Sequence, residues 1–292
     1  MKLIIGCANF GNSYGLKKKN LGQKKINEIV KQAKKFGVNH FDTAYDYNKS
    51  EYFLGKSIKK IYLSRNVLVD TKLPKKINFK GKNKNCEKII KSSIKRLNIK
   101  KINTLYIHDP NQLLKKDGIL LYNELIKAKK LNLIKKIGIS VYTKTEIKKT
   151  LNKFRIDVVQ VPYNILDTRF TEKKLLYFLK KKKCILVARS IFLKGLLLKK
   201  QPNMIKFFKK WKKTFIKLNL ILKKNNLQLK NWTINHVSKN RNFKNFIVGV
   251  SQVNQLKEIH SILSKKRNYN SVPFKLDVVS KSLINPKYWK IN

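Results

Sequence analysis

Acidic side chains are scarce in this 292-residue sequence, where 15 Asp and Glu residues stand against 69 Lys and Arg residues. The formal net charge of +54 is typical of proteins that bind nucleic acids or anionic membranes. Arginine is also scarce, since 7 of the 69 bases are Arg and the remaining 62 are Lys. Base readout and bidentate phosphate binding favour arginine, and these lysines are spread along the whole chain. We therefore attribute the charge to a compositional bias toward AT-rich codons, with weak, salt-sensitive adhesion to RNA or anionic lipid as a side effect. Specific nucleic-acid binding remains an alternative.

Cysteines and long apolar runs are few as well. Cys7, Cys86 and Cys184 are an odd number without metal-ligand spacing, so we predict reduced thiols and no metal. No apolar run reaches the roughly 18 to 20 residues that a membrane-spanning helix needs. A strand pattern starts at Met1 and leaves no room for a signal peptide. These absences predict a cytoplasmic protein without membrane insertion.

Short apolar segments alternate with helical patterns from one end of the sequence to the other. Gly37 follows the first helical pattern, and Ser50 is a plausible N-cap for the second. The predicted strands are 3–10, 40–44, 67–73, 104–109, 136–141, 158–162, 184–190 and 246–250. The predicted helices are 26–36, 51–61, 89–97, 119–131, 145–154, 172–182, 203–222, 228–239 and 253–263.

Eight strands that are apolar on both faces, each followed by a helical pattern, are typical of parallel sheets. An open doubly wound sheet and a closed barrel both satisfy this pattern. The number of strands and the lack of any linker favour a single (β/α)8 TIM barrel over 1–292, an α/β fold. Residues 270–292 are expected to form a C-terminal extension that packs on the barrel.

Four polar side chains follow the ends of the second, third and fourth predicted strands: Asp42, Tyr47, Lys72 and His108. In a parallel barrel these strand ends meet at one mouth. An ammonium group beside a phenol lowers the pKa of the phenol, so Lys72 is expected to lower that of Tyr47, with Asp42 holding the lysine charge in place. His108 would add a donor that polarises a substrate carbonyl. The pattern predicts a catalytic site.

Each of these residues alone has an ordinary structural explanation. An Asp at a strand end is more often a turn or cap residue, and an isolated Tyr usually packs. A single Lys among 62 carries no information, and a lone His is more often a core residue than a catalyst. Their joint position at three successive strand ends favours the catalytic interpretation.

The segment Phe41-Asp42-Thr43-Ala44-Tyr45-Asp46-Tyr47, with Glu51 and Leu54-Gly55 after it, resembles the signature of the aldo-keto reductases. Lys72 and His108 stand where that family places its other two catalytic groups. The similarity continues through 138–141, 160–164, 188–197 and 248–251. The segments 11–15, 108–110 and 188–198 are similar to the branch associated with bacterial surface-polysaccharide or sugar-nucleotide pathways.

The resemblance implies an NAD(P)H-dependent oxidoreductase that reduces a small-molecule aldehyde or ketone to an alcohol, or catalyses the reverse reaction. Tyr47 would be the general acid, Lys72 and Asp42 would tune it, and His108 would orient the carbonyl. A non-catalytic nicotinamide-binding regulatory subunit on the same fold is the alternative. The cofactor-binding residues implied by the resemblance are Ser140, Gln160, Arg189, Ser190, Gly249, Ser251 and Gln255.

Three positions depart from the family pattern. Asn48 stands where a glycine is usual, but Asn tolerates left-handed backbone angles, so the turn should survive. Arg189 replaces an aromatic residue that stacks on the nicotinamide in many members. Gln255 falls near the position where many members have an arginine for the 2′-phosphate. NADP is therefore the family expectation, with NAD as the other candidate.

Overall fold

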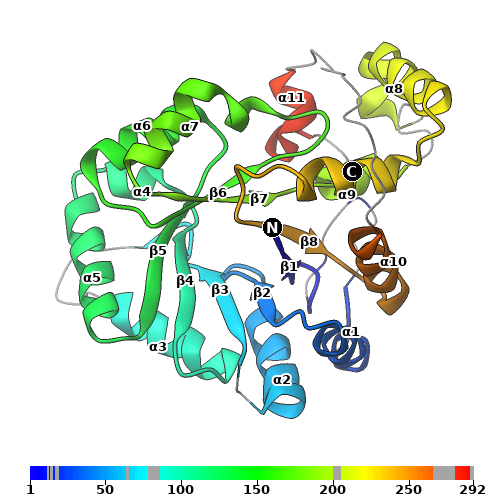
Figure 1. Ribbon diagram of the computed structural model, residues 1–292. Coiled ribbons are helices and arrows are strands. Elements are labelled where there is room, and N and C mark those ends of the chain that lie inside the picture. The colour runs from blue at the N-terminus through cyan, green and yellow to red at the C-terminus, as the bar shows by residue number, and fades with distance from the viewer. Residues whose placement is uncertain are drawn as a thin grey trace.

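Eight parallel strands close into a barrel in the computed structural model, which describes residues 1–11, 13, 16, 20–63, 66–77, 86–199, 205–265 and 280–289 (Figure 1). The strands are paired in sequence order, and β8 closes the ring on β1. The predicted (β/α)8 fold is confirmed. The strands are β1 (Lys2–Gly6), β2 (His40–Asp42), β3 (Leu68–Lys72), β4 (Ile102–Ile107), β5 (Ile134–Ser140), β6 (Val158–Pro162), β7 (Ile185–Arg189) and β8 (Asn245–Gly249).

Helices surround the barrel and cover its outer face (Figure 1). The α-helices are α1 (Gln23–Lys35), α2 (Ser50–Tyr62), α3 (Cys86–Leu97), α4 (Asn111–Leu114), α5 (Gly118–Lys130), α6 (Lys144–Lys153), α7 (Lys173–Lys181), α8 (Lys212–Lys224), α9 (Leu229–Ser238), α10 (Val253–Ser264) and α11 (Lys281–Ile284). Short 3-10 helices are η1 (Arg169–Thr171), η2 (Leu193–Leu198), η4 (Lys206–Trp211) and η5 (Pro286–Tyr288).

The α1 helix shows why the sequence patterns predicted these elements. Its buried residues Ile26, Ile29, Val30 and Ala33 recur at the spacing of one helix face. Gly37 follows the helix with φ +68°, a backbone conformation that costs glycine little. The apolar face packs into the large cluster between the strands and the surrounding helices.

Alternation along each strand divides the side chains between this outer cluster and the barrel interior. On β4, Leu105 and Ile107 join the outer cluster, whereas Tyr106 packs in a separate cluster with Ile4 of β1 and Val158 of β6. Interior positions toward the carboxyl ends of the strands are polar. The paired registers bring six interior residues to these strand ends: Asp42, Lys72, Tyr106, Ser140, Gln160 and Arg189.

Some predicted boundaries are wrong. The first strand ends at Gly6 rather than at residue 10, because the chain turns after Cys7, where the amide of Phe10 donates to the carbonyl of Cys7. Ser50 is the first residue of α2 rather than its N-cap, and its hydroxyl donates to the carbonyl of Cys7 at 2.7 Å. This hydrogen bond ties the start of α2 to the end of β1.

The predicted helix 203–222 also differs from the structure. A 3-10 helix, η4, precedes α8, and Lys212 begins the α-helix. The tighter turn places Phe208 and Trp211, three residues apart, on one side, where both are buried. They belong to a second apolar cluster that contains Leu283 and Ile284 of α11.

From residues 280–289, Leu283 and Ile284 of α11 belong to that second cluster, and Trp289 packs against it. The segment 11–15 and the predicted extension at 270–292 lie partly outside the described residues. Within the described ranges, no helix combines the length and the apolar character that crossing a membrane requires.

Candidate active site

The ion pair between Lys72 and Asp42 lies at the centre of the strand ends, with 3% of the lysine side chain and 5% of the aspartate side chain exposed. The ammonium group donates to both carboxylate oxygens and, at 2.7 Å, to the carbonyl of Thr43. All three ammonium hydrogens therefore have acceptors. Burial raises the pKa of Asp42, and the contact with Lys72 offsets part of this rise.

Tyr47 comes from the loop after β2, and its ring faces this ion pair. The centroid of the ring lies 5.5 Å from the Nζ atom of Lys72. Burial raises the pKa of the Tyr47 phenol, and the negative charge of Asp42 raises it further. The prediction of a lowered pKa is wrong, because burial and the charge of Asp42 outweigh the effect of nearby cations. The phenol is protonated at neutral pH.

His108 follows β4, and its ring meets that of Tyr47 edge to face, with 5.9 Å between the ring centroids. Its Nδ1 atom lies 3.5 Å from the Oδ2 atom of Asp46 and has no hydrogen-bond partner among the described residues. The Asp46 charge would favour imidazolium, but burial and nearby cations, with Lys72 first among them, lower the pKa of His108 to about 3. We assign a neutral imidazole because desolvation outweighs a contact of this length.

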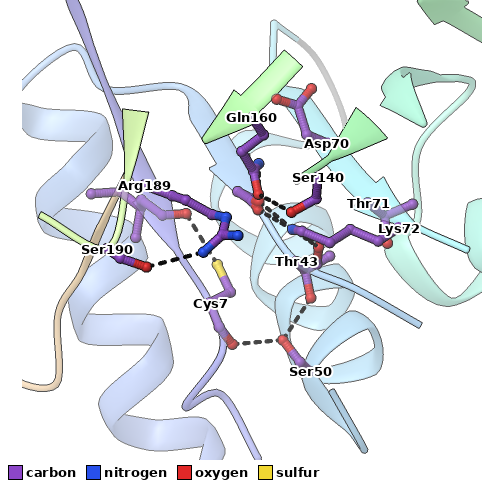
Figure 2. Close-up of polar contacts among 12 residues, drawn as sticks. Cys7, Thr43, Ser50, Asp70, Thr71, Lys72, Ser140, Gln160, Arg189 and Ser190 are labelled. Atoms are coloured by element: carbon purple, nitrogen blue, oxygen red, sulfur yellow. Dashed lines mark hydrogen bonds and ion pairs between the residues drawn. The ribbon is translucent and has the colours of Figure 1, made fainter. Parts of the chain in front are cut away.

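Gln160 and Ser140 connect the next two strand ends to the ion pair. The Nε2 atom of Gln160 donates to Asp42 at 3.2 Å, and the Ser140 hydroxyl donates to Gln160 Oε1 at 3.4 Å. Figure 2 shows Ser140 and Gln160 beside Lys72. Both side chains are nearly fully buried, with 5% of Ser140 and 1% of Gln160 exposed. A carboxamide group, which both donates and accepts, matches this pair of side chains.

Arg189 ends β7 and reaches across to the loop after β5. Its guanidinium donates to the carbonyl of Val141 at 3.0 Å and to the hydroxyl of Ser190 at 3.2 Å, the latter contact visible in Figure 2. The Cζ atom of Arg189 lies 4.2 Å from the ring centroid of Tyr142. Ser190 adopts φ +57°. Arg189 is therefore held over the interior side of the strand ends rather than directed to solvent.

The last strand and its helix form the remaining part of the predicted site. Gly249 ends β8 beside Gly6, and a Cβ atom on Gly249 would lie 3.8 Å from the carbonyl oxygen of Gly6, which is ordinary contact. The amide and the hydroxyl of Ser251 both donate to the Oε1 atom of Gln255, at 2.8 and 3.2 Å. Gln255 thus closes the turn that leads into α10.

The sequence matches the aldo/keto reductase family over residues 2–271. The chain belongs to this family. No curated protein matches it. Solved structures share the fold at low sequence identity.

The holo form of an aldo-keto reductase from Bacillus halodurans is 19% identical, with a TM-score of 0.71 over 90% of this chain and 87% of that one. A thermostable aldo-keto reductase in complex with the inhibitor epalrestat is 22% identical, with a TM-score of 0.70 over 91% of each chain. The glycerol dehydrogenase of Gluconobacter oxydans is 18% identical, with a TM-score of 0.67 over 90% of this chain and 86% of that one. These similarities support the barrel fold.

This aldo/keto reductase family member keeps the turn after Tyr47, since Asn48 adopts the expected left-handed conformation with φ +49°. The structure also contains a polar network that the sequence analysis left unassigned. The carboxylate of Glu51 on α2 accepts from the Thr71 hydroxyl and from the Arg96 guanidinium. Thr71 precedes Lys72, so this network holds the strand end that presents the lysine. In the sequence, Glu51 was noted as part of the family signature but was given no role.

Tyr106 and Tyr142 also lie at the site and were not identified from the sequence. Tyr106 is fully buried and pairs with Lys72 across strands β4 and β3. The centroid of its ring lies 5.6 Å from the Nζ atom of Lys72. Tyr142 contacts Arg189, and also the Nζ atom of Lys287 at 4.4 Å from the ring centroid. The alternation along β4 could have indicated Tyr106. Nothing in the local sequence indicates Lys287.

Proposed function

We propose that this protein is an NAD(P)H-dependent reductase that converts an aldehyde or ketone to an alcohol, or catalyses the reverse reaction, with Tyr47 as the general acid. One observation carries the proposal. The buried Lys72–Asp42 pair lies beside the rings of Tyr47 and His108 at the ends of three successive strands. A phenol, a cation and an imidazole converge there on one small region, as carbonyl reduction requires.

The protonation states support the assigned roles. A general acid must hold its proton before the reaction, and burial keeps the Tyr47 phenol protonated. The ammonium group of Lys72, near the ring, would stabilise the phenolate that remains after proton transfer. The neutral His108 ring carries one N–H, which can donate to the substrate carbonyl and polarise it. Asp42 fixes Lys72 in place and balances its charge.

The reduced nicotinamide cofactor would supply the hydride. Ser140 and Gln160 would hold its carboxamide, because they form a buried donor and acceptor pair at adjacent strand ends. Arg189 and Ser190 would lie beside the nicotinamide ring. The cofactor phosphates would lie at the start of α10, near Gly249, Ser251 and Gln255. We propose NADP as the cofactor on the basis of the family, with NAD as the alternative.

The finer assignments are part of the same proposal. We place the reductase in the cytoplasm and assign it a small-molecule carbonyl substrate without a specific nucleic-acid partner. The short segments shared with reductases of surface-polysaccharide and sugar-nucleotide pathways make a carbohydrate-derived carbonyl compound the first group of substrates to examine.

The test compares Tyr47→Phe with Tyr45→Phe in a panel of aldehydes with NADPH and NADH. Tyr45 lies in the same loop with its side chain toward Arg96, so its variant is the matched control. Tyr47→Phe should lower kcat by about 10²- to 10⁴-fold while cofactor binding, followed by fluorescence, is retained. Tyr45→Phe should stay near wild type. Undiminished turnover by Tyr47→Phe would exclude the acid role, and tight cofactor binding without turnover by the wild type would favour the regulatory subunit.

A further inference from the structure

Cationic side chains come from three separate segments to the region beside His108. The Oδ2 atom of Asp46 accepts from the backbone amide of Lys75 at 3.0 Å and lies 3.5 Å from the His108 ring. The backbone of Lys75, in the loop after β3, therefore lies close to the imidazole ring of His108. Its side chain is exposed at the barrel mouth.

Lys287 approaches the same region from the C-terminal segment. Its Nζ atom lies 4.4 Å from the ring centroid of Tyr142, and the Arg189 guanidinium contacts the same ring. The Nε atom of Arg189 is buried and has no hydrogen-bond partner among the described residues. The Tyr142 ring thus contacts both Lys287 of the C-terminal segment and Arg189 of β7.

The position of Lys287 is fixed by buried anchors on both sides of it. Ile284 and Pro286 are buried before it, and Ile284 belongs to the second apolar cluster. After it, the indole N–H of Trp289 donates to the carbonyl of Leu283 at 3.0 Å, and the Trp289 ring packs edge to face on Phe208. The segment is held by packing that does not involve Lys287, so its charge is available for a ligand.

Titratable groups on two different strand ends report the sign of the local potential. After burial, the causes that lower the pKa of His108 are all cations: Lys72, Lys75, Arg189 and Lys287. Arg189 and then Lys287 lower the pKa of the Tyr142 phenol against the effect of burial. Lys72 is neutralised by Asp42, whereas Lys75 and Lys287 form no ion pair with any of the residues that the structure describes. A negative group is therefore favoured in this region.

We propose that the carbonyl substrate carries an anionic group, a carboxylate or a phosphate, that Lys75 and Lys287 bind beside His108. This inference rests on the proposed function, because it assigns a substrate class to the same site. The carbonyl would lie at Tyr47 and His108, with the anionic group toward the loop after β3 and the C-terminal segment.

The cofactor phosphates are the other source of negative charge. They are proposed to lie at the turn between β8 and α10, whereas Lys75 follows β3, three strands away around the closed ring. Substrate and cofactor kinetics distinguish the two sources. If Lys75 and Lys287 bind the cofactor instead, their removal raises the KM for NADPH and affects neutral and anionic substrates equally.

The net charge of +54 attracts every anion, so a control lysine is needed. Lys135 is exposed near the amino end of β5, at the opposite end of the barrel from the strand ends that form the site. Lys135→Gln removes the same charge as Lys75→Gln or Lys287→Gln. A general attraction predicts equal effects of all three substitutions, whereas a local site does not.

The experiment uses matched substrates with and without charge: 4-carboxybenzaldehyde against its methyl ester, and glyceraldehyde 3-phosphate against glyceraldehyde. The wild type should show a lower KM for the charged member of at least one pair. Lys75→Gln and Lys287→Gln should each raise that KM about tenfold, since hydrogen bonds to charged groups are the stronger ones. The KM for neutral substrates and for NADPH should not change, and Lys135→Gln should resemble the wild type.

A direct binding measurement covers the case in which no aldehyde is reduced. Terephthalate is an unreactive dicarboxylate, and its binding to wild type, Lys287→Gln and Lys135→Gln can be followed by calorimetry. Binding that only Lys287→Gln weakens supports the anion site even if the reductase proposal fails. Equal KM values for charged and neutral substrates, equal effects of all three lysine substitutions, or no terephthalate binding would each overturn it.

Discussion

The carboxylate of Glu51 receives two hydrogen bonds from the guanidinium of Arg96, at 2.8 Å from Nε and 2.5 Å from Nη2. Glu51 is 2% exposed, and its second oxygen accepts from Thr71 at 2.6 Å. The carboxylate thus links α2 to α3 and to β3, one residue before Lys72. Two charge-assisted hydrogen bonds to one carboxylate oxygen, with a third donor on the other, fix the orientation of Glu51 as well as balancing its charge.

Arg96→Ala should destabilise the protein by about 3 kcal/mol, because it leaves the charged Glu51 buried without its partner. This value is the lower end of the range for a buried ion pair, since Arg96 itself is partly exposed. Urea unfolding measures the change. Lys230→Ala is the control, since it breaks an exposed ion pair with Glu258 and should leave the unfolding midpoint nearly unchanged. Equal midpoints for the two variants would show that the Glu51 network does not support the barrel.

The pKa of His108 makes stability depend on pH. Burial lowers this pKa from 6.5 to about 3, so between these values the unfolded chain binds more protons at this residue than the folded protein does. The free energy of unfolding should therefore rise with pH across this window, by at most about 1.4 kcal/mol per pH unit for one group. This increase should be complete above pH 6.5.

His108→Asn should remove the part of the pH dependence that His108 contributes, which urea unfolding at several pH values would measure. His236 needs a parallel variant, since burial also lowers its pKa, to about 4. His236→Asn should remove a different part of the slope and leave carbonyl reduction intact. An unchanged slope in both variants would show that neither imidazole is held neutral.

The fold was predictable because it depends on patterns that repeat along the chain. The buried residues Ile26, Ile29 and Val30 of α1 show one helix face, and every one of the eight strands was found. The errors occurred where one long-range contact overrides the local pattern. Ser50 looks like an N-cap, but its hydroxyl bonds to Cys7, 43 positions earlier in the chain.

The candidate site was predictable in its positions and less so in its electrostatics. Strand ends placed Asp42 and Lys72 together, and the structure joins them in a buried ion pair. The raised pKa of Tyr47 results mainly from burial, and the extent of burial cannot be obtained from residue spacing. Lys287 reaches Tyr142 only through packing of the C-terminal segment, which no short motif describes.

The Lys72–Asp42 pair should behave as a coupled unit. Lys72→Met and Asp42→Leu should each destabilise the protein by about 3–5 kcal/mol, because each leaves the other charge buried without its partner. The double variant should be much closer to the wild type in stability, since neither charge of this pair remains. A double-mutant cycle from urea unfolding measures the coupling, and additive losses would contradict it.

Catalysis should separate from stability in the same set of variants. The double variant should fold but reduce aldehydes poorly, because the Lys72 ammonium group no longer lies near the Tyr47 ring. Wild-type turnover by a stable double variant would exclude Lys72 from the reaction.

Gly138 of β5 leaves room for the ring of Tyr106. A Cβ atom at Gly138 would lie 2.5 Å from Cδ1 and 2.6 Å from Cε1 of Tyr106, and 3.0 Å from Cγ2 of Thr104. The fully buried ring cannot move away without disturbing Lys72 above it, so Gly138→Ala should cost about 1–3 kcal/mol as overpacking. Gly249→Ala is the control for stability, because its Cβ atom would meet only ordinary contact.

A second substitution on the facing strand tests the cause of this loss. Tyr106→Leu removes the ring edge that the new methyl group meets, so Gly138→Ala combined with Tyr106→Leu should be less destabilised than the sum of the single variants. Tyr106→Phe keeps the ring and should give no relief. Relief by Tyr106→Phe would instead trace the cost to the buried hydroxyl, which has no hydrogen-bond partner among the described residues. Thermal unfolding of the five variants distinguishes these outcomes, because only a clash with the ring makes leucine and phenylalanine behave differently.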